Sequence, residues 1–350
     1  MKILVDAMGG DHAPAEIVKG AVEAAAELDI KIVLVGIQDV ICNLLMQNPL
    51  YESVKAKIEI INADEVIDME DDPFSVMRAK KNSSMSVAMR MLAAGEADAM
   101  VSAGNTGAMF TGSSMIVRPI KHVRRGAIAT ILPLEKPLLL LDSGANVTVT
   151  AEYLVHFAYM GSVYMNKLFG IKSPRVALLN NGTESCKGTP ALVEAYKQLE
   201  KMDINFIGNV EAKDIPFGKC DVLVTDGFTG NIVLKYTEGI GKFFLKKLKS
   251  VFYSNIITKA SALLLKKHMS GLRREFDASE YGGAPILGIS HPVIKAHGSS
   301  DARAIRNAIR QAVEFVKTDV IRDIAERALD IFVQKTACAD SDESQADTVE

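Results

Sequence analysis

Five short polar segments have a composition that could bind an anion. Each follows an apolar run, precedes a stretch of helical period, and is built from glycine, hydroxyl, carboxamide and carboxylate residues. The segments are Asp6–His12, Ser102–Gly107, Asp142–Asn146, Asn180–Glu184 and Asp226–Asn231. Glycine lets the backbone come close to a ligand, and the first N–H groups of a helix attract negative charge. The same residue types also form turns and helix caps, but five segments of one kind favour a crevice for a phosphate-bearing or phosphate-like ligand.

Three side chains in or beside these segments could take part in chemistry. Lys187 lies just before a predicted helix start, where a cation is unfavourable unless an anion binds between the two; the alternative is that it points to solvent. Cys186 could accept an acyl group, although a lone cysteine more often packs inertly. His12 could serve as a base or contact an anion, or it could simply bond to backbone.

The chain lacks the usual nucleotide, metal and serine-hydrolase motifs. It contains no G-x-x-x-x-G-K-[ST] loop, and no G-x-G-x-x-G follows the first predicted strand. It also contains no H-E-x-x-H segment, no closely paired cysteines and no Gly-x-Ser-x-Gly elbow. The sequence therefore predicts catalysis without a metal, a cofactor or a covalent nucleophile.

The elements that must position these residues alternate between short apolar runs and helical stretches. This alternation is typical of an α/β fold with a doubly wound, mostly parallel sheet. Because the carboxyl ends of the strands in such a sheet lie along one edge, we expect the five polar segments there. The predicted strands are Lys2–Asp6, Lys31–Val35, Ile58–Asn62, Ala97–Ser102, Gly126–Leu132, Pro137–Asp142, Arg175–Leu179, Ile204–Ile207 and Asp221–Thr225. The predicted helices are Pro14–Leu28, Ser84–Ala94, Thr148–Phe169, Thr189–Lys201, Ser300–Val316 and Thr318–Val333.

Composition places limits on the class of protein. The 350 residues carry a formal net charge of −3, which argues against a general nucleic-acid binder. No apolar run approaches the ~20 residues that span a bilayer, and the chain reaches Asp6 too soon for the apolar region of a signal peptide. We therefore expect a cytoplasmic protein. No linker divides it, so residues 1–335 are predicted to form a single catalytic unit, followed by a disordered acidic tail at 336–350.

One segment combines a basic and an apolar stripe. Between Lys242 and Arg274 there are nine bases and no acid, and apolar residues recur at three- and four-residue spacing. This pattern predicts an amphipathic helical hairpin inserted at about 240–280, with an ordinary core helix and solvated lysines as the alternative. The bases that we expect to contact a partner or a membrane are Lys259, Lys266, Lys267, Arg273 and Arg274.

Taken together, the polar segments resemble a known family. The opening Met1–His12 with Ala13-Pro14, together with Ser102–Gly107, Asp142–Asn146, Asn180–Lys187 and Asp226–Asn231, closely resembles the bacterial acyl-acyl-carrier-protein:phosphate acyltransferases of phospholipid synthesis. The resemblance covers roughly residues 1–335. It implies an α/β/α sandwich similar to phosphotransacetylases and isocitrate-type dehydrogenases. It also implies transfer of a long-chain fatty acyl group from acyl carrier protein to inorganic phosphate, giving an acyl phosphate for a membrane-bound glycerol-phosphate acyltransferase.

The resemblance also suggests roles for residues and partners. Lys187 would bind phosphate or stabilise the transition-state charge, and Asn231 would donate to the carbonyl oxygen. The basic segment would contact acidic acyl carrier protein, a second copy in a homodimer, or the inner face of the cell membrane, where the protein would associate peripherally. The further candidates for the substrate and phosphate site are His12, Asn105, Thr106, Ser143, Asn146, Asp226 and Thr229.

Other functions remain open from the residues alone. A short-chain phosphotransacetylase that uses coenzyme A, or a nicotinamide-dependent dehydrogenase, could share the same fold. A non-enzymatic scaffold at the membrane surface would need only the basic helices. These alternatives differ in the acyl donor, in the need for a nicotinamide cofactor and in whether Lys187 is required for function.

Overall fold

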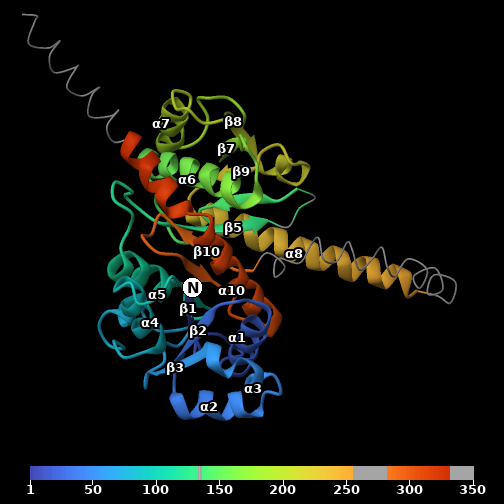
Figure 1. Ribbon diagram of the computed structural model, residues 1–350. Coiled ribbons are helices and arrows are strands. Elements are labelled where there is room, and N and C mark those ends of the chain that lie inside the picture. Colours follow the sequence, from blue (N-terminus) through green and yellow to red (C-terminus); the bar gives the residue numbers. More distant parts are fainter. Residues whose placement is uncertain (133, 135, 255–281, 332–350) are drawn as a thin grey trace, which may run out of the picture.

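Eleven strands form one continuous sheet in the computed structural model, which describes residues 1–132, 134, 136–254 and 282–331. The strand order is β3-β2-β1-β4-β11-β10-β5-β6-β9-β7-β8. The strands are β1 (Lys2–Asp6), β2 (Lys31–Gly36), β3 (Ile58–Asn62), β4 (Ala99–Ser102), β5 (Ala127–Leu132), β6 (Leu138–Leu141), β7 (Val176–Asn180), β8 (Phe206–Glu211), β9 (Val222–Val224), β10 (Ala284–Leu287) and β11 (Val293–Lys295). All nine predicted strands are present, and β10 and β11 are additional. Figure 1 shows one half of the molecule around β1 to β3 and the other around β5, β7, β8 and β9.

The two halves of the sheet run in opposite directions. Strands β3, β2, β1, β4 and β11 are mutually parallel, and so are β6, β9, β7 and β8. Between the two sets, β10 is antiparallel to β11 and to β5, and β5 is antiparallel to β6. The sheet is thus mixed and mostly parallel, and the expectation of a single carboxyl edge is wrong. Its strands end at two edges because the central antiparallel strands reverse the chain direction.

Helices cover both faces of each half, which explains why strand residues alternate between two cores. In β1, Ile3 and Val5 pack beneath α1 and α10, whereas Leu4 faces α4 and α5. In β6, alternate leucines likewise enter two different clusters. The helices are α1 (Ala15–Glu27), α2 (Gln38–Gln47), α3 (Tyr51–Val54), α4 (Ser84–Ala93), α5 (Thr106–Gly112), α6 (Ala151–Phe169), α7 (Pro190–Leu199), α8 (Gly227–Phe252) and α10 (Ala302–Lys317), and residues 320–331 are also helical. Short 3-10 or π turns lie at Lys55–Lys57, Pro73–Val76, Ser113–Val117 and Ala212–Phe217.

Helix α8 differs from the others because only its first two turns pack against the core. Gly227 and Gly230 are its buried residues, and the rest of the helix extends away from the sheet (Figure 1). The helix begins at Gly227, fifteen residues before Lys242, which is the first base of the basic stripe in the sequence. The remainder of the predicted hairpin lies outside the described residues, as do its five candidate contact bases and the acidic tail. None of the helices in the described ranges is long and apolar enough to cross a bilayer.

Candidate functional site

Three of the polar segments meet at one edge of the second half. They follow β6, β9 and β7, which are consecutive, parallel neighbours in the sheet. Lys187 and Asn231 both lie here and both are exposed. Neither the Lys187 ammonium nor the Asn231 carboxamide has a hydrogen-bond or ion-pair partner within the part of the chain that the structure describes. These two polar groups are therefore available to a ligand.

The buried carboxylate of Asp142 organises the segment after β6. It accepts hydrogen bonds from the backbone N–H groups of Ile128 (3.1 Å), Gly144 (3.1 Å) and Asn146 (2.6 Å), and from the Asn146 carboxamide (2.8 Å). Burial raises the pKa of Asp142, and the N–H donors oppose that shift by favouring the ionised form. Such a carboxylate fixes the loop backbone and has little capacity left for substrate.

The polar atoms of Ser143 and Asn146 are also engaged by the protein. The Ser143 hydroxyl contacts the Thr130 hydroxyl at 2.7 Å and donates to the Ile128 carbonyl at 3.0 Å. The Asn146 carboxamide donates to Asp142 and to the Gly126 carbonyl, and its Oδ1 accepts from Nε of Arg125 at 2.8 Å. Both side chains are buried, so their first effect is to shape the loop.

The first turn of α8 is clamped onto this loop. Asp226 caps the helix by accepting from the Thr229 N–H (2.8 Å) and hydroxyl (2.7 Å), so the predicted residues Asp226 and Thr229 satisfy each other. The Gly227 N–H donates to the Asn146 carbonyl at 2.7 Å. A Cβ on Gly230 would lie only 1.9 Å from the Asp142 carbonyl oxygen, so only glycine allows this approach. Asn231, the next residue, stands opposite Gly144.

The turn that carries Lys187 is held by its backbone. The Asn180 carboxamide donates to the Lys187 carbonyl at 2.9 Å, and the Lys187 N–H donates to the Glu184 carbonyl at 3.1 Å. Gly188 has φ +95° and packs on Asn180, where a Cβ would lie 2.7 Å from its Oδ1. Thr189 then caps α7. Lys187 thus lies just before a helix start, as the sequence predicted, and its side chain is exposed; Cys186 beside it is also exposed.

The remaining predicted residues lie at the edge of the first half. Asn105 caps α5 through the Ala108 N–H (3.0 Å), and its amide nitrogen donates to the carbonyls of Asp68, Met69 and Asp71. Its carboxamide is thus occupied by the protein. Thr106 and His12 are exposed, and no hydrogen bond from the His12 imidazole occurs within the described residues.

Sequence reasoning missed a buried lysine near these residues. Lys295 ends β11, and its ammonium donates to the carbonyls of Ala103 and Ala296. Burial lowers the pKa of Lys295 to about 8, although the charges of Asp11 and Asp6 act in the opposite direction. A single charge within the apolar run Val293–Ala296 is the signal that could have identified it.

Contacts join the two edges. The Arg125 guanidinium, which binds Asn146 in the second half, lies 5.5 Å from the ring centroid of Phe110 on α5. Farther along α8, Lys235 influences His297 in the turn after β11. The pKa of His297 is lowered first by burial and then by the positive charge of Lys235. Arg125 thus bridges the two halves at their junction, although the strands that carry the five segments end at opposite edges.

Comparison with known proteins settles the family. A family model described as a fatty acid synthesis protein matches residues 1–323. The phosphate acyltransferase of Thermoanaerobacter pseudethanolicus is 46% identical over 328 residues, which cover 93% of this chain and 97% of that protein. The phosphate acyltransferase of Clostridioides difficile is 43% identical over 326 residues, covering 93% and 95%. The chain belongs to the phosphate acyltransferase family.

Membership in this family confirms the resemblance found in the sequence, and the protein is an acyltransferase. Among solved structures, a phosphotransacetylase from Streptococcus pyogenes aligns with a TM-score of 0.58 and 19% identity, over 91% of this chain and 94% of that one. The 4-hydroxythreonine-4-phosphate dehydrogenase from Klebsiella pneumoniae aligns with a TM-score of 0.51 and 14% identity, over 90% and 99%. These likenesses show the fold alone, and they confirm the predicted fold class.

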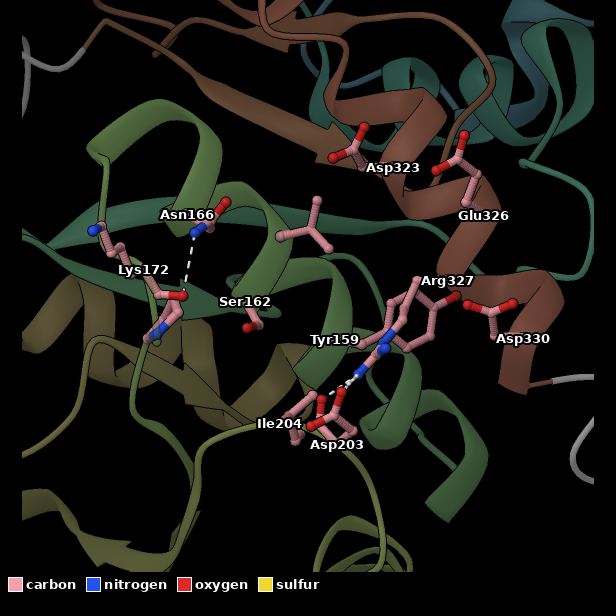
Figure 2. A pocket seen from close by; sticks show the side chains of 12 residues that line it. Tyr159, Ser162, Asn166, Lys172, Asp203, Ile204, Asp323, Glu326, Arg327 and Asp330 are labelled. Atoms are coloured by element: carbon pink, nitrogen blue, oxygen red, sulfur yellow. Dashed lines mark hydrogen bonds and ion pairs between the residues drawn. The ribbon is translucent and has the colours of Figure 1, made fainter.

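A cavity of about 310 Å³ lies away from the junction of the halves, between α6 and helical residues 320–331 (Figure 2). Its charged lining residues are Asp203, Asp323, Glu326, Asp330, Lys172 and Arg327. The Arg327 guanidinium is already used, because it donates to the Asp203 carbonyl. Since four carboxylates face two cations, this cavity suits an anion poorly.

Proposed function

We propose that this acyltransferase moves a long-chain fatty acyl group from acyl carrier protein to inorganic phosphate and releases an acyl phosphate. The observation that carries this proposal is the pair of exposed polar side chains, Lys187 and Asn231, which have no partner in the described residues. They lie at an edge where the buried or capping side chains of Asp142, Asn146 and Asp226 are hydrogen-bonded to the protein. The names of the relatives, phosphate acyltransferases, support phosphate as the acceptor.

The chemistry needs positioning more than a nucleophilic side chain. Inorganic phosphate is an anion at neutral pH, so one of its oxygens can form a bond to the thioester carbonyl carbon directly. The carbon–sulfur bond then breaks, and the leaving thiolate takes a proton from solvent. The protein must align the two reactants and stabilise the oxyanion that develops on the carbonyl oxygen.

Lys187 and Asn231 fit these two tasks. The ammonium of Lys187 can hold phosphate or balance the charge of the transition state, and the Asn231 carboxamide can donate to the carbonyl oxygen. His12 and Thr106, which are exposed, are proposed to contact phosphate or the donor. Asn105, Ser143, Asn146, Asp226 and Thr229 remain proposed lining residues, which would act through the shape that their hydrogen bonds impose.

The surface of α8 supports an acidic macromolecular donor and a second copy of the chain. Its described part carries the exposed bases Lys242, Lys246, Lys247 and Lys249, which would steer acidic acyl carrier protein towards the site. Large apolar side chains at three- and four-residue spacing are also exposed, and together they suit a homodimer interface or a membrane surface. These apolar residues are Phe228, Ile232, Tyr236, Ile240, Phe243 and Phe244.

We further propose where the protein works. Residues 1–335 would act as a single catalytic unit in the cytoplasm, attached peripherally to the inner face of the cell membrane. From there the acyl phosphate would pass to a membrane-bound glycerol-phosphate acyltransferase. The bases Lys259, Lys266, Lys267, Arg273 and Arg274 are proposed to contact the carrier or the membrane.

The direct test is thiol release from long-chain acyl carrier protein as phosphate is varied. We expect saturable, phosphate-dependent release and formation of a hydroxylamine-reactive acyl phosphate. Long-chain acyl-coenzyme A is the control donor and should react much more slowly. Thiol release without phosphate would overturn the proposal.

Two relatives in fold define the competing outcomes. Faster release from acetyl-coenzyme A than from the carrier would favour a short-chain phosphotransacetylase, the activity in the name of the Streptococcus pyogenes neighbour. Phosphate-independent reduction of a nicotinamide cofactor would favour a dehydrogenase, the activity in the name of the Klebsiella pneumoniae neighbour.

A further inference from the structure

We propose that Arg125 is a phosphate-binding residue of this site, held in place by the pair Asp142 and Asn146. This inference rests on the proposed function and adds a residue that the sequence did not single out. Arg125 lies in the loop between the π turn at Ser113–Val117 and β5. It is exposed, yet one end of its guanidinium is fixed by buried groups.

The fixed end is part of a chain of hydrogen bonds. Nε of Arg125 donates to Oδ1 of Asn146 at 2.8 Å, and Nδ2 of Asn146 donates to Oδ2 of Asp142 at 2.8 Å. Asn146 and Asp142 are 4% and 0% exposed, so neither can move far without opening the core. The buried carboxylate thus sets the orientation of the Asn146 amide, and the amide oxygen sets the direction of Nε.

A second contact restricts the guanidinium from another element. Its central carbon lies 5.5 Å from the ring centroid of Phe110, which is largely buried on α5. Cation–π contacts of this kind are favourable and also limit the orientations of the side chain. The two Nη groups, in contrast, have no hydrogen-bond or ion-pair partner anywhere in the described residues.

Free Nη groups on a fixed guanidinium suit phosphate. Their N–H groups form a planar fork that can bind two phosphate oxygens at once, and preorganisation lowers the entropic cost of that binding. The position fits as well, because the Asn146 carbonyl accepts from Gly227, one turn before Asn231 on α8. A phosphate on Arg125 would therefore lie beside the helix start where Asn231 could donate to the thioester carbonyl.

Arg124 provides a matched control from the adjacent position. It is also exposed, but its Nε pairs with Glu152 at 3.7 Å, and it makes no contact with Asn146 or Phe110 among the described residues. Arg124→Gln and Arg125→Gln thus remove the same charge from the same loop. Only the second removes the fork that we assign to phosphate.

The test compares phosphate dependence in the wild type, Arg124→Gln, Arg125→Gln and Arg125→Lys. For Arg125→Gln we expect the KM for phosphate to rise about 10- to 100-fold, as for loss of a charge-assisted hydrogen-bonded pair. The KM for acyl carrier protein should stay near the wild-type value. The Tm without phosphate should fall because Oδ1 of Asn146 loses its donor, so the phosphate-induced shift is measured from each variant's own phosphate-free Tm. Arg125→Lys should be intermediate because it keeps the charge and loses the fork, and Arg124→Gln should match the wild type.

A binding measurement makes the result independent of turnover. Millimolar phosphate should raise the Tm of the wild type and of Arg124→Gln, and it should raise that of Arg125→Gln much less. An unchanged phosphate KM and an unchanged phosphate-induced Tm shift in Arg125→Gln would refute the inference while leaving the proposed function intact. A wild type with no phosphate-dependent thiol release would instead refute the proposed function itself.

Discussion

Two segments that follow parallel strands of the second half have similar compositions and contrasting structures. Asp142–Asn146, after β6, turns its polar side chains inward, and the Asp142 carboxylate alone binds several N–H groups. Asn180–Lys187, two strands away in the sheet, uses Asn180 to hold its backbone and leaves the Lys187 ammonium in solvent. The comparison shows that composition can locate a site, whereas burial and hydrogen bonding separate the scaffold from the groups that can react.

The surroundings of the two segments explain the difference. Asp142–Asn146 is enclosed between the start of β5 and the first turn of α8, where Gly227 and Gly230 allow close packing. Polar groups in such a place must find partners inside the protein. Asn180–Lys187 lies beside β8, the last strand of the sheet, so its side chains can remain hydrated. We therefore expect substitutions in the enclosed segment to affect stability, and those at exposed residues to affect turnover.

Asn231→Ala tests the exposed side of this contrast and should have a large effect on turnover. Loss of one oxyanion donor typically lowers kcat by about 100- to 1000-fold. The Tm should hardly change because the Asn231 carboxamide has no partner in the described residues. Asn43→Ala, which removes another exposed helical carboxamide far from the site on α2, should retain activity. A fall in Tm without a fall in kcat would mean that Asn231 supports the fold and does not donate to the oxyanion.

Asp142→Ala tests the enclosed side. Removal of the carboxylate leaves buried N–H groups without an acceptor, and we expect the free energy of unfolding to fall by about 3 kcal/mol or more. Urea denaturation measures this change. Asp29→Ala, in which a solvent-exposed carboxylate is lost, serves as the control and should unfold at the wild-type urea concentration. Equal stability of the Asp142 variant would mean that the loop does not depend on its carboxylate.

Lys295→Met tests whether a buried charged group in the first half of the sheet also affects stability. Burial lowers the pKa of Lys295 to about 8, so between pH 8 and pH 10 the unfolded chain holds a proton that the folded protein has released. The free energy of unfolding of the wild type should therefore rise over this range, by about 3 kcal/mol at most, because of this residue. The variant should lack that part of the rise in urea denaturation at the two pH values. If the free energies of unfolding of the wild type and the variant changed equally between the two pH values, Lys295 would have an ordinary pKa.

Local patterns were sufficient for much of the fold. The long apolar runs predicted nine strands, and a charge before a helix start identified Lys187. The strands β10 and β11 were missed because Pro285 interrupts the first, Lys295 breaks the apolar run of the second, and Gly288 and Pro292 lie between them. Strand β10 pairs antiparallel with β5, which lies more than 150 residues earlier in the chain. This pairing helps to reverse the strand direction between the halves, and no local pattern reveals it.

Contacts between residues distant in the chain also limited the prediction of the site. Asn105 and Asn146 have the residue types of ligands, yet their carboxamides are consumed by contacts that no spacing rule reveals. Arg125 gave no signal in the sequence, because its significance depends on Asn146 and on Phe110, each at least fifteen residues away. Local chemistry can be predicted from residue type, whereas the availability of a polar group depends on tertiary packing.

The most direct measurement of the central claim is the turnover of Lys187→Ala, with long-chain acyl carrier protein and phosphate as substrates and thermal unfolding recorded on the same sample. Lys197→Ala, an exposed lysine on the adjoining α7, is the matched control. We expect an unchanged Tm with a loss of about 100- to 1000-fold in kcat for Lys187→Ala alone. Wild-type turnover in a normally folded Lys187→Ala protein would contradict this expectation.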